Sequence, residues 1–182
     1  MRTALVALLI LALGQVAVAQ TPYYQIYFDD AHTIAAMDCP PGPVGTVIDT
    51  IHVVAHNFNT FFIATEFAID YSANLLHMGD IPGGDLVIGS SPTGITQSWG
   101  TPVMAFNPVR VMSATVLWMC SGCAGSENTP VVVIPNPMTS GLVFVNWPGV
   151  QAVNAVGMTS LICATVPVEE TSWGRIKALY EE

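Results

Sequence analysis

Residues 46–71, TVIDTIHVVAHNFNTFFIATEFAIDY, decide the fold of this chain. In the first half, the odd positions from Val47 to Ala55 are mostly apolar, and so are the odd positions from Phe61 to Tyr71 in the second half. Successive side chains of a strand point to opposite faces, so each run predicts a half-buried strand. The short link between them, Asn-Phe-Asn-Thr, is rich in Asn, which tolerates turn dihedrals. We therefore expect a tight antiparallel connection between two strands.

Each run also predicts which side chains face the interior. Val53, Ile63 and Phe67 belong to the expected inward rows, whereas Thr50, His52, His56, Glu66 and Asp70 belong to the outward rows. The whole fold prediction depends on these inward rows being buried.

The rest of the chain repeats short strand signals separated by Gly, Pro and Asn. Val109 to Met119 is apolar at both parities, which predicts a strand that is covered on both faces or runs through the middle of the sandwich. Short strands at this spacing indicate an all-β, antiparallel two-sheet β-sandwich of about eight to ten strands. The other expected strands are residues 23–28, 74–78, 86–88, 95–99, 131–134, 142–147, 151–156 and 158–163.

The first nineteen residues have the pattern of a cleaved secretory signal peptide. Arg2 supplies a positive charge, residues 4–13 an apolar core, and Ala17-Val18-Ala19 a small-x-small cleavage site. The apolar run is shorter than the roughly 20 residues that a membrane-spanning helix needs. We expect three parts: the signal at 1–19, a sandwich domain at 20–165, and a linker with a short helical tail at 166–182. The signal predicts an extracellular or cell-surface location, with the periplasm as the alternative.

The chain is acidic. Its formal net charge of −9 becomes −10 once Arg2 is removed with the signal. A surface of this charge repels nucleic acid and anionic membranes, so neither is an expected partner. No later apolar run is long enough to predict a membrane span.

The four cysteines are an even number in a chain predicted to be exported, which indicates disulfides. Three pairings exist, and we favour Cys39 with Cys163 and Cys120 with Cys123. The first closes about 125 residues and is worth roughly 5 kcal/mol in the loop-entropy model, and the second roughly 2 kcal/mol. Loop sequence follows Cys123, so the CxxC is interpreted as structural, with redox chemistry or zinc binding as alternatives.

Three aspartates are the best metal candidates. Asp29, Asp30 and Asp38 could supply carboxylates to Ca²⁺, although turn formation explains them more simply and no other cofactor is expected. On a strand, His52 and His56 lie about 13 Å apart, too far to share one ion.

The sequence contains no recognised catalytic motif. Gly-x-Ser-x-Gly, His-Glu-x-x-His and phosphate-binding glycine loops are all missing, so we expect a non-enzymatic protein. A hydrolase that uses loop carboxylates remains an alternative. Asp80 and Asp85, which flank a turn, could supply an acid and a base, and so could the group of Asp29, Asp30 and Asp38.

Aromatic residues suggest a second alternative, a carbohydrate-binding module. Trp99 and Trp147, with Trp118, Tyr23 and Tyr24, could form a platform for sugar rings, and core packing explains them equally well.

The C-terminal residues differ in character from the rest. Thr171 or Ser172 could cap a short helix, and four side chains would then fall near one face: Trp173, Ile176, Leu179 and Tyr180. A helix this short is not stable alone, so the tail is expected to dock on the sandwich or on another molecule.

Two segments carry a resemblance to known proteins. Residues 67–75 (FAIDYSANL), followed by Gly79 and Leu86-Val-Ile-Gly, resemble cohesin-like and related carbohydrate-binding sandwich domains of bacteria over residues 46–119. The ending PVEETSWGRIKALY resembles the Trp-Gly-x-Ile-Lys-x-Leu-Tyr tail of many uncharacterised exported bacterial proteins, and implies a sorting or attachment signal.

The leading hypothesis from the sequence is a secreted β-sandwich for adhesion, surface assembly or binding of a protein or glycan at the cell surface. The sequence leaves the ligand and the oligomeric state open.

Overall fold

The computed structural model describes residues 21–37, 45–71, 75–104, 108–120 and 129–162, and within them every regular element is a β-strand. The strands are β1 (Tyr23–Tyr27), β2 (Ala36–Met37), β3 (Gly45–His56), β4 (Phe61–Asp70), β5 (Leu75–Pro82), β6 (Leu86–Ser90), β7 (Gly94–Met104), β8 (Val109–Cys120), β9 (Thr129–Ile134), β10 (Val143–Trp147), β11 (Ala152–Asn154), β12 (Val156–Gly157) and β13 (Thr159–Ile162). The predicted all-β fold is confirmed for these residues.

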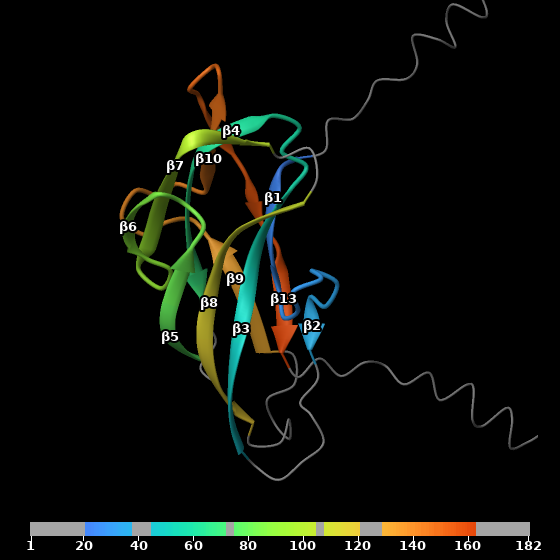
Figure 1. Cartoon of the computed structure of the whole chain (residues 1–182). Helices are drawn as coiled ribbons and strands as arrows, with labels where there is room; N and C mark the ends of the chain where they lie inside the picture. The colour runs from blue at the N-terminus through green and yellow to red at the C-terminus, as the bar shows by residue number, and fades with distance from the viewer. Residues whose placement is uncertain (1–20, 38–44, 72–74, 105–107, 121–128, 163–182) are drawn as a thin grey trace, which may run out of the picture.

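The strands form two sheets. One has five strands in the order β12-β1-β3-β8-β5, and the other has the order β11-β10-β4-β9-β13-β2, with β7 paired to β4 and β6 paired to β7. The two longest strands, β3 and β8, run side by side along the molecule (Figure 1). β8 is an inner strand of its sheet, because it pairs with β3 on one side and β5 on the other. The predicted cover on both faces holds for Val111 to Ala114, which are buried, whereas Thr115 and Leu117 are half-buried.

The sheets are mixed rather than purely antiparallel, which corrects the prediction. β1 pairs with β12 in parallel in one sheet, and β2 pairs with β13 in parallel in the other. The two end regions of the described chain therefore run side by side, and both cross from the five-stranded sheet to the other one. Parallel pairs of this kind cannot be made by hairpins, so periodicity along one strand does not reveal them.

The predicted hairpin between β3 and β4 is wrong. β3 pairs only with β1 and β8 among the described strands, whereas β4 lies in the other sheet. The link at 57–60 instead crosses from one sheet to the other, with Asn57 in the left-handed region at φ 60°. The physical reason is Phe58, which is buried in the link and contacts the rings of Phe62 and Phe144. An aromatic side chain inserted between the sheets favours a crossing over a solvent-exposed turn.

The predicted inward rows are correct for β3 and for the second half of β4 only. Ile51, Val53, Phe67 and Ile69 are buried as expected. Near the start of β4, four residues of β7 lie opposite Ile63 in a bulge, between the pairs Phe62–Val103 and Ala64–Ser98. The extra residues change the parity, so Phe62 is fully buried while Phe61 and Ile63 are half-buried.

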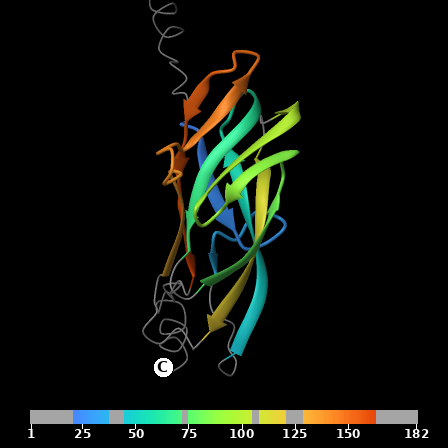
Figure 2. The same cartoon turned by 90° about the vertical axis from the view of Figure 1, so that its left-hand side faces the viewer.

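The core between the sheets is apolar and rich in aromatic rings. Tyr24 and Phe67 are fully buried with ring centroids 5.2 Å apart, and Phe58 packs 4.3 Å from Phe144. The view in Figure 2, turned by 90°, shows the lower ends of β3 and β8 together at one end of the molecule. The core leaves the outer face of each sheet free to carry function.

Several predictions lie outside the described residues. These are the signal peptide, the helical tail, Asp38, and the cysteines at 39, 123 and 163; Cys120 ends β8, but its side chain is not described. In the described ranges, no helix has the length and apolarity to cross a bilayer.

Candidate functional site

The outer face of the five-stranded sheet carries polar side chains at one end and apolar ones at the other. We call the surface of β3, β8 and β5 the histidine face. Its ladder rows are Ile48–Leu117–Leu76, Thr50–Thr115–Gly79 and His52–Ser113–Ile81, with Arg110 opposite Val54 beyond them. Side chains directly opposite each other in a ladder share a face, so these rows lie on one surface.

The loop that follows β1 covers the polar end of this face. Asp29 closes the loop by accepting hydrogen bonds from the amides of Thr33 (2.9 Å) and Ile34 (2.7 Å). Asp30 then reaches the sheet, where its Oδ1 lies 3.3 Å from His52 Nε2 and 3.2 Å from Arg110 Nη1.

Three histidines lie close together where this loop meets the sheet, and we call them the histidine cluster: His32 of the loop, and His52 and His56 of β3. The His32 ring lies edge-on to His52, with centroids 5.8 Å apart, and 5.9 Å from Tyr27. Tyr27 in turn donates to or accepts from His56 Nε2 at 3.1 Å. His52 and His56 do point the same way along β3, as predicted, and aromatic rings fill the space between them.

Burial lowers the pKa of two histidines on β3. Burial lowers the pKa of His52, and the positive charge of Arg110 lowers it further, against the opposite effect of Asp30. Burial and the nearby His32 lower the pKa of His56. Both rings are therefore neutral at pH 7.

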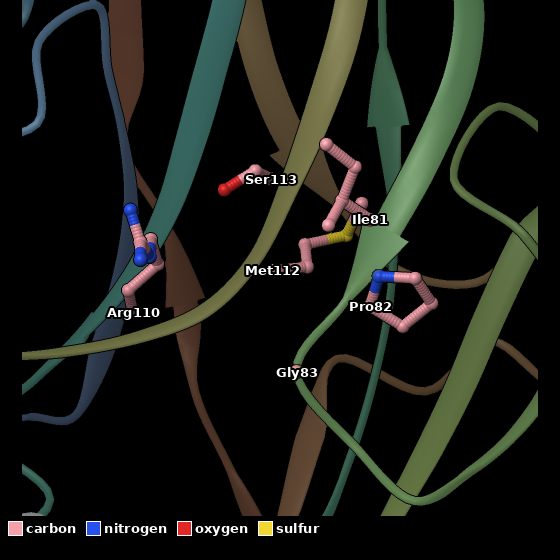
Figure 3. Close-up of a pocket in the computed structure, with 6 residues that line it drawn as sticks. All are labelled: Ile81, Pro82, Gly83, Arg110, Met112 and Ser113. Atoms are coloured by element: carbon pink, nitrogen blue, oxygen red, sulfur yellow. The ribbon is translucent and has the colours of Figure 1, made fainter.

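A pocket of about 230 Å³ adjoins the cluster, between β8 and the end of β5. Figure 3 shows Arg110, Met112 and Ser113 from β8 and Ile81, Pro82 and Gly83 from the β5 side. It offers one guanidinium and one hydroxyl beside apolar walls.

Ser113, His52 and Asp30 form a line of contacts that motif searching missed. Ser113 Oγ lies 2.8 Å from His52 Nδ1, and His52 Nε2 faces Asp30. A hydrolytic triad also needs amides free to stabilise an oxyanion. Ser113 lies within a strand paired on both sides, and the Asp30 side chain is 87% exposed and shared with Arg110. The line is therefore better suited to fastening the loop to the sheet than to activating a nucleophile.

The predicted carboxylate sites are placed in structural contacts. Asp29 and Asp30 hold the loop, while Asp38 lies outside the described residues. Asp80 accepts hydrogen bonds from the amide (2.8 Å) and hydroxyl (2.6 Å) of Ser91. Asp85 accepts one from the amide of Gly100 at 2.7 Å. In the part of the chain that the structure describes, no three His, Cys, Asp or Glu side chains are placed to hold a metal ion.

The outer face of the other sheet is mostly apolar. We call the surface of β10, β4, β7 and β6 the aliphatic face. Its ladder rows are Trp147–Phe61–Met104, Val145–Ala64–Ser98–Leu86 and Val143–Glu66–Thr96–Ile88. Ile88 is 67% exposed, Leu86 62%, Met104 60% and Trp147 45%. In these rows Glu66 is the single charge, and its carboxylate accepts a hydrogen bond from Thr139.

The predicted aromatic residues are dispersed. Trp99 packs edge-on against Phe62 inside the sandwich, and its indole N–H donates to Gly83 O at 2.7 Å. Trp147 lies on the aliphatic face, on the opposite side of the same sheet. Tyr24 is fully buried, and Tyr23 stacks on His56 with centroids 4.6 Å apart. Trp99 and Trp147 therefore do not share one platform.

Sequence analysis did not identify the aliphatic face. Leu86 and Ile88 occur two apart in a segment interpreted only as a short apolar strand. Their spacing places them on one face, but only the pairing of β6 with β7 shows that this face is the outer one.

No protein-family model matches the sequence, and neither does any curated protein. Solved structures do match. A CaDoc0917–CaCohA2 complex solved at pH 5.5 is 14% identical with a TM-score of 0.51, over 80% of this chain and all of that chain. The type III cohesin module of the ScaE cell-surface anchoring scaffoldin of Ruminococcus flavefaciens is 12% identical with a TM-score of 0.48, over 82% of this chain and 91% of that one. The sixth cohesin of Acetivibrio cellulolyticus scaffoldin B, in complex with a Cel5 dockerin, is 9% identical with a TM-score of 0.46, over 80% and 99%. The fold is thus a cohesin-like β-sandwich.

Proposed function

We propose that this chain is an exported, non-enzymatic binding module that docks a protein partner on its aliphatic face. The observation that carries the proposal is the exposure of four large apolar side chains, Leu86, Ile88, Met104 and Trp147, on ladder rows of one sheet face. Single exposed apolar side chains are ordinary, but several on one face favour an interaction surface.

The chemistry of the face defines the partner. Apolar side chains at the centre and few charges are typical of the buried part of a protein interface, with an aromatic residue such as Trp147 as an anchor. Glu66 adds one acceptor among the apolar groups, so the partner should present a hydrogen-bond donor or a cation there. A partner of this kind suits adhesion or surface assembly, and the cohesin-like fold occurs in the two-protein CaDoc0917–CaCohA2 complex.

The test compares full-length variants immobilised on beads and incubated with the secreted and surface proteins of the source cells. Leu86→Asp combined with Ile88→Asp should reduce retention of the partner by at least about tenfold, because it places two charges in a desolvated contact. Met78→Asp is the matched control, since Met78 is 55% exposed but lies on β5 of the other sheet.

Two outcomes would contradict the proposal. One is equal retention by the double variant, the wild type and the Met78→Asp control. The other is retention of polysaccharide with quenching of tryptophan fluorescence, which would favour the carbohydrate-binding alternative.

A further inference from the structure

An apolar strip remains on the histidine face where the loop after β1 does not cover it. Ile48 is 66% exposed, Leu76 57% and Ile81 56%, and Leu117 lies between Ile48 and Leu76 in the ladder. We call these four residues the apolar strip. Three neighbouring strands contribute to it, and Ile81 also borders the pocket beside Arg110.

The C-terminal segment begins at the same end of the molecule as the strip. β13 ends at Ile162, beside Met37 and opposite Thr129. β3 begins at Gly45 and β8 ends at Cys120, opposite each other, and β13 points toward that end (Figure 1). Ile48 and Leu117 lie three residues from Gly45 and Cys120.

The chain is long enough to reach the strip. Residues 163–172 separate Ile162 from Trp173. Extended chain spans about 3.3–3.6 Å per residue, so this linker can cover roughly 35 Å. The pairings of the aliphatic face do not place its ladder rows beside the end of the molecule at which the chain leaves β13.

The chemistry of residues 173–180, WGRIKALY, is complementary to the apolar strip and to the net negative charge of the described residues. Four of its side chains are large and apolar: Trp173, Ile176, Leu179 and Tyr180. The segment also carries Arg175 and Lys177 and no acid. The described part of the chain has seven carboxylates and a single cation, Arg110, so its surface attracts a basic segment.

We propose that residues 173–180 of this chain dock on the apolar strip of its own histidine face. Docking would bury Ile48, Leu76 and Ile81 without a second molecule, and it would leave the aliphatic face free for a partner. The inference goes beyond the proposed function and does not depend on it, because it concerns the opposite sheet.

Trypsin provides the test, since the full chain offers it few sites. Lysine and arginine occur only at Arg2, Arg110, Arg175 and Lys177, and Arg110 lies within the paired strand β8. Cleavage of the native full-length protein after Arg175 or Lys177 therefore reports on whether the segment is accessible. When docking and release are fast, the cleavage rate follows the released fraction.

Ile48→Gln combined with Leu76→Gln should raise the rate of cleavage after Arg175 by at least about tenfold, because it removes apolar contacts from the strip without adding a charge that attracts Arg175 and Lys177. The matched control is Leu86→Gln combined with Ile88→Gln on the aliphatic face, which should leave the rate unchanged. All four positions are exposed, and the thermal midpoint of each variant verifies folding.

Equal cleavage rates in the wild type and both double variants would overturn the inference, and so would an equal increase in the two variants. Protection of the wild type should also be independent of protein concentration. Protection that appears only at high concentration would show that a second copy, rather than the chain's own segment, covers the strip.

Discussion

The two outer faces of this sandwich differ although one core supports both. On the histidine face, a loop of the chain itself covers the polar end through Asp30, His32 and His52. On the aliphatic face, Leu86 and Ile88 stand more than half exposed on β6, which pairs only with β7 among the described strands. Contacts within the chain therefore cover the polar end of one face, whereas the other face is the one that we propose for a partner.

The largest expected effect concerns the edge of the sheet that carries the aliphatic face. β2 and β13 pair in parallel there, and the paired residues Met37 and Ile162 are the described residues nearest in sequence to Cys39 and Cys163. The predicted bridge between these two cysteines requires Cα atoms typically 4.4–6.8 Å apart. Cys163→Ser should lower the free energy of unfolding by roughly 5 kcal/mol, measured by denaturant titration without reductant.

Cys123→Ser is the control for that measurement, and its smaller loop predicts a cost of roughly 2 kcal/mol. Equal stability of Cys163→Ser and the wild type would contradict the bridge, as would a Cys39–Cys120 peptide in a non-reducing digest.

The next largest effect is expected from a substitution in the core that lies between the two sheets. Phe58 is buried in the crossing between the sheets and contacts Tyr24, Phe62 and Phe144. Phe58→Ala should cost about 3–5 kcal/mol, because the cavity opens between the sheets. Thermal and denaturant unfolding measure this, with the exposed Met138→Ala as a control expected to change stability by less than about 0.5 kcal/mol. A small effect of Phe58→Ala would mean that the crossing does not depend on this ring.

A smaller effect is expected where hydrogen bonds join β5 of one sheet to the turn between β6 and β7 of the other. Asp80 on β5 accepts hydrogen bonds from Ser91 in the turn between β6 and β7, and its Oδ1 lies 2.9 Å from His77 Nε2. Asp80→Asn keeps the shape but replaces one acceptor oxygen by a donor, so it should cost about 1–3 kcal/mol. Asp70→Asn is the control, since Asp70 is exposed at the end of β4. If the two variants unfolded at the same denaturant concentration, the contact between β5 and the turn would have no stabilising role.

The smallest expected effect is a pH dependence of the free energy of unfolding that arises from the histidine face. The pKa values of His52 and His56 are lowered in the folded protein, so below about pH 6.5 the unfolded chain binds more protons than the folded one. Their contribution is fully present above that pH and is lost as the pH falls. His52→Asn, which can still bond to Ser113, should therefore lose less stability between pH 7.5 and pH 5.5 than the wild type. Equal losses in urea titrations at the two pH values would contradict the assignment.

The sequence predicted the strands well because side-chain alternation is local. Val53 and Phe67 are buried as their parity requires, and consecutive residues of β8, such as Val111 and Met112, are buried as its apolar character at both parities predicted. Parity does not say which strand pairs with which, so β3 and β4 were placed in one hairpin although they lie in different sheets. The apolar Phe58 in the link was the one local signal of the crossing.

The candidate sites depend on contacts between distant residues, which alternation cannot supply. Asp30 meets Arg110 across 80 positions, and Ser113 meets His52 across 61. Trp99 and Trp147 do not share a platform because they contact successive residues of β4, which point to opposite faces: Phe61 outside with Trp147 and Phe62 inside with Trp99. Composition alone did indicate an acidic, apolar chain without catalytic motifs.

The most direct test of the central claim is site-specific photo-cross-linking of the full-length protein with its source-cell surface and secreted proteins. Benzoylphenylalanine replaces Ile88 on the aliphatic face in one preparation and Leu76 on the histidine face in another. The proposed function predicts a covalent adduct with a second polypeptide from position 88 and none from position 76. An adduct from position 76 alone, or from neither position, would contradict it.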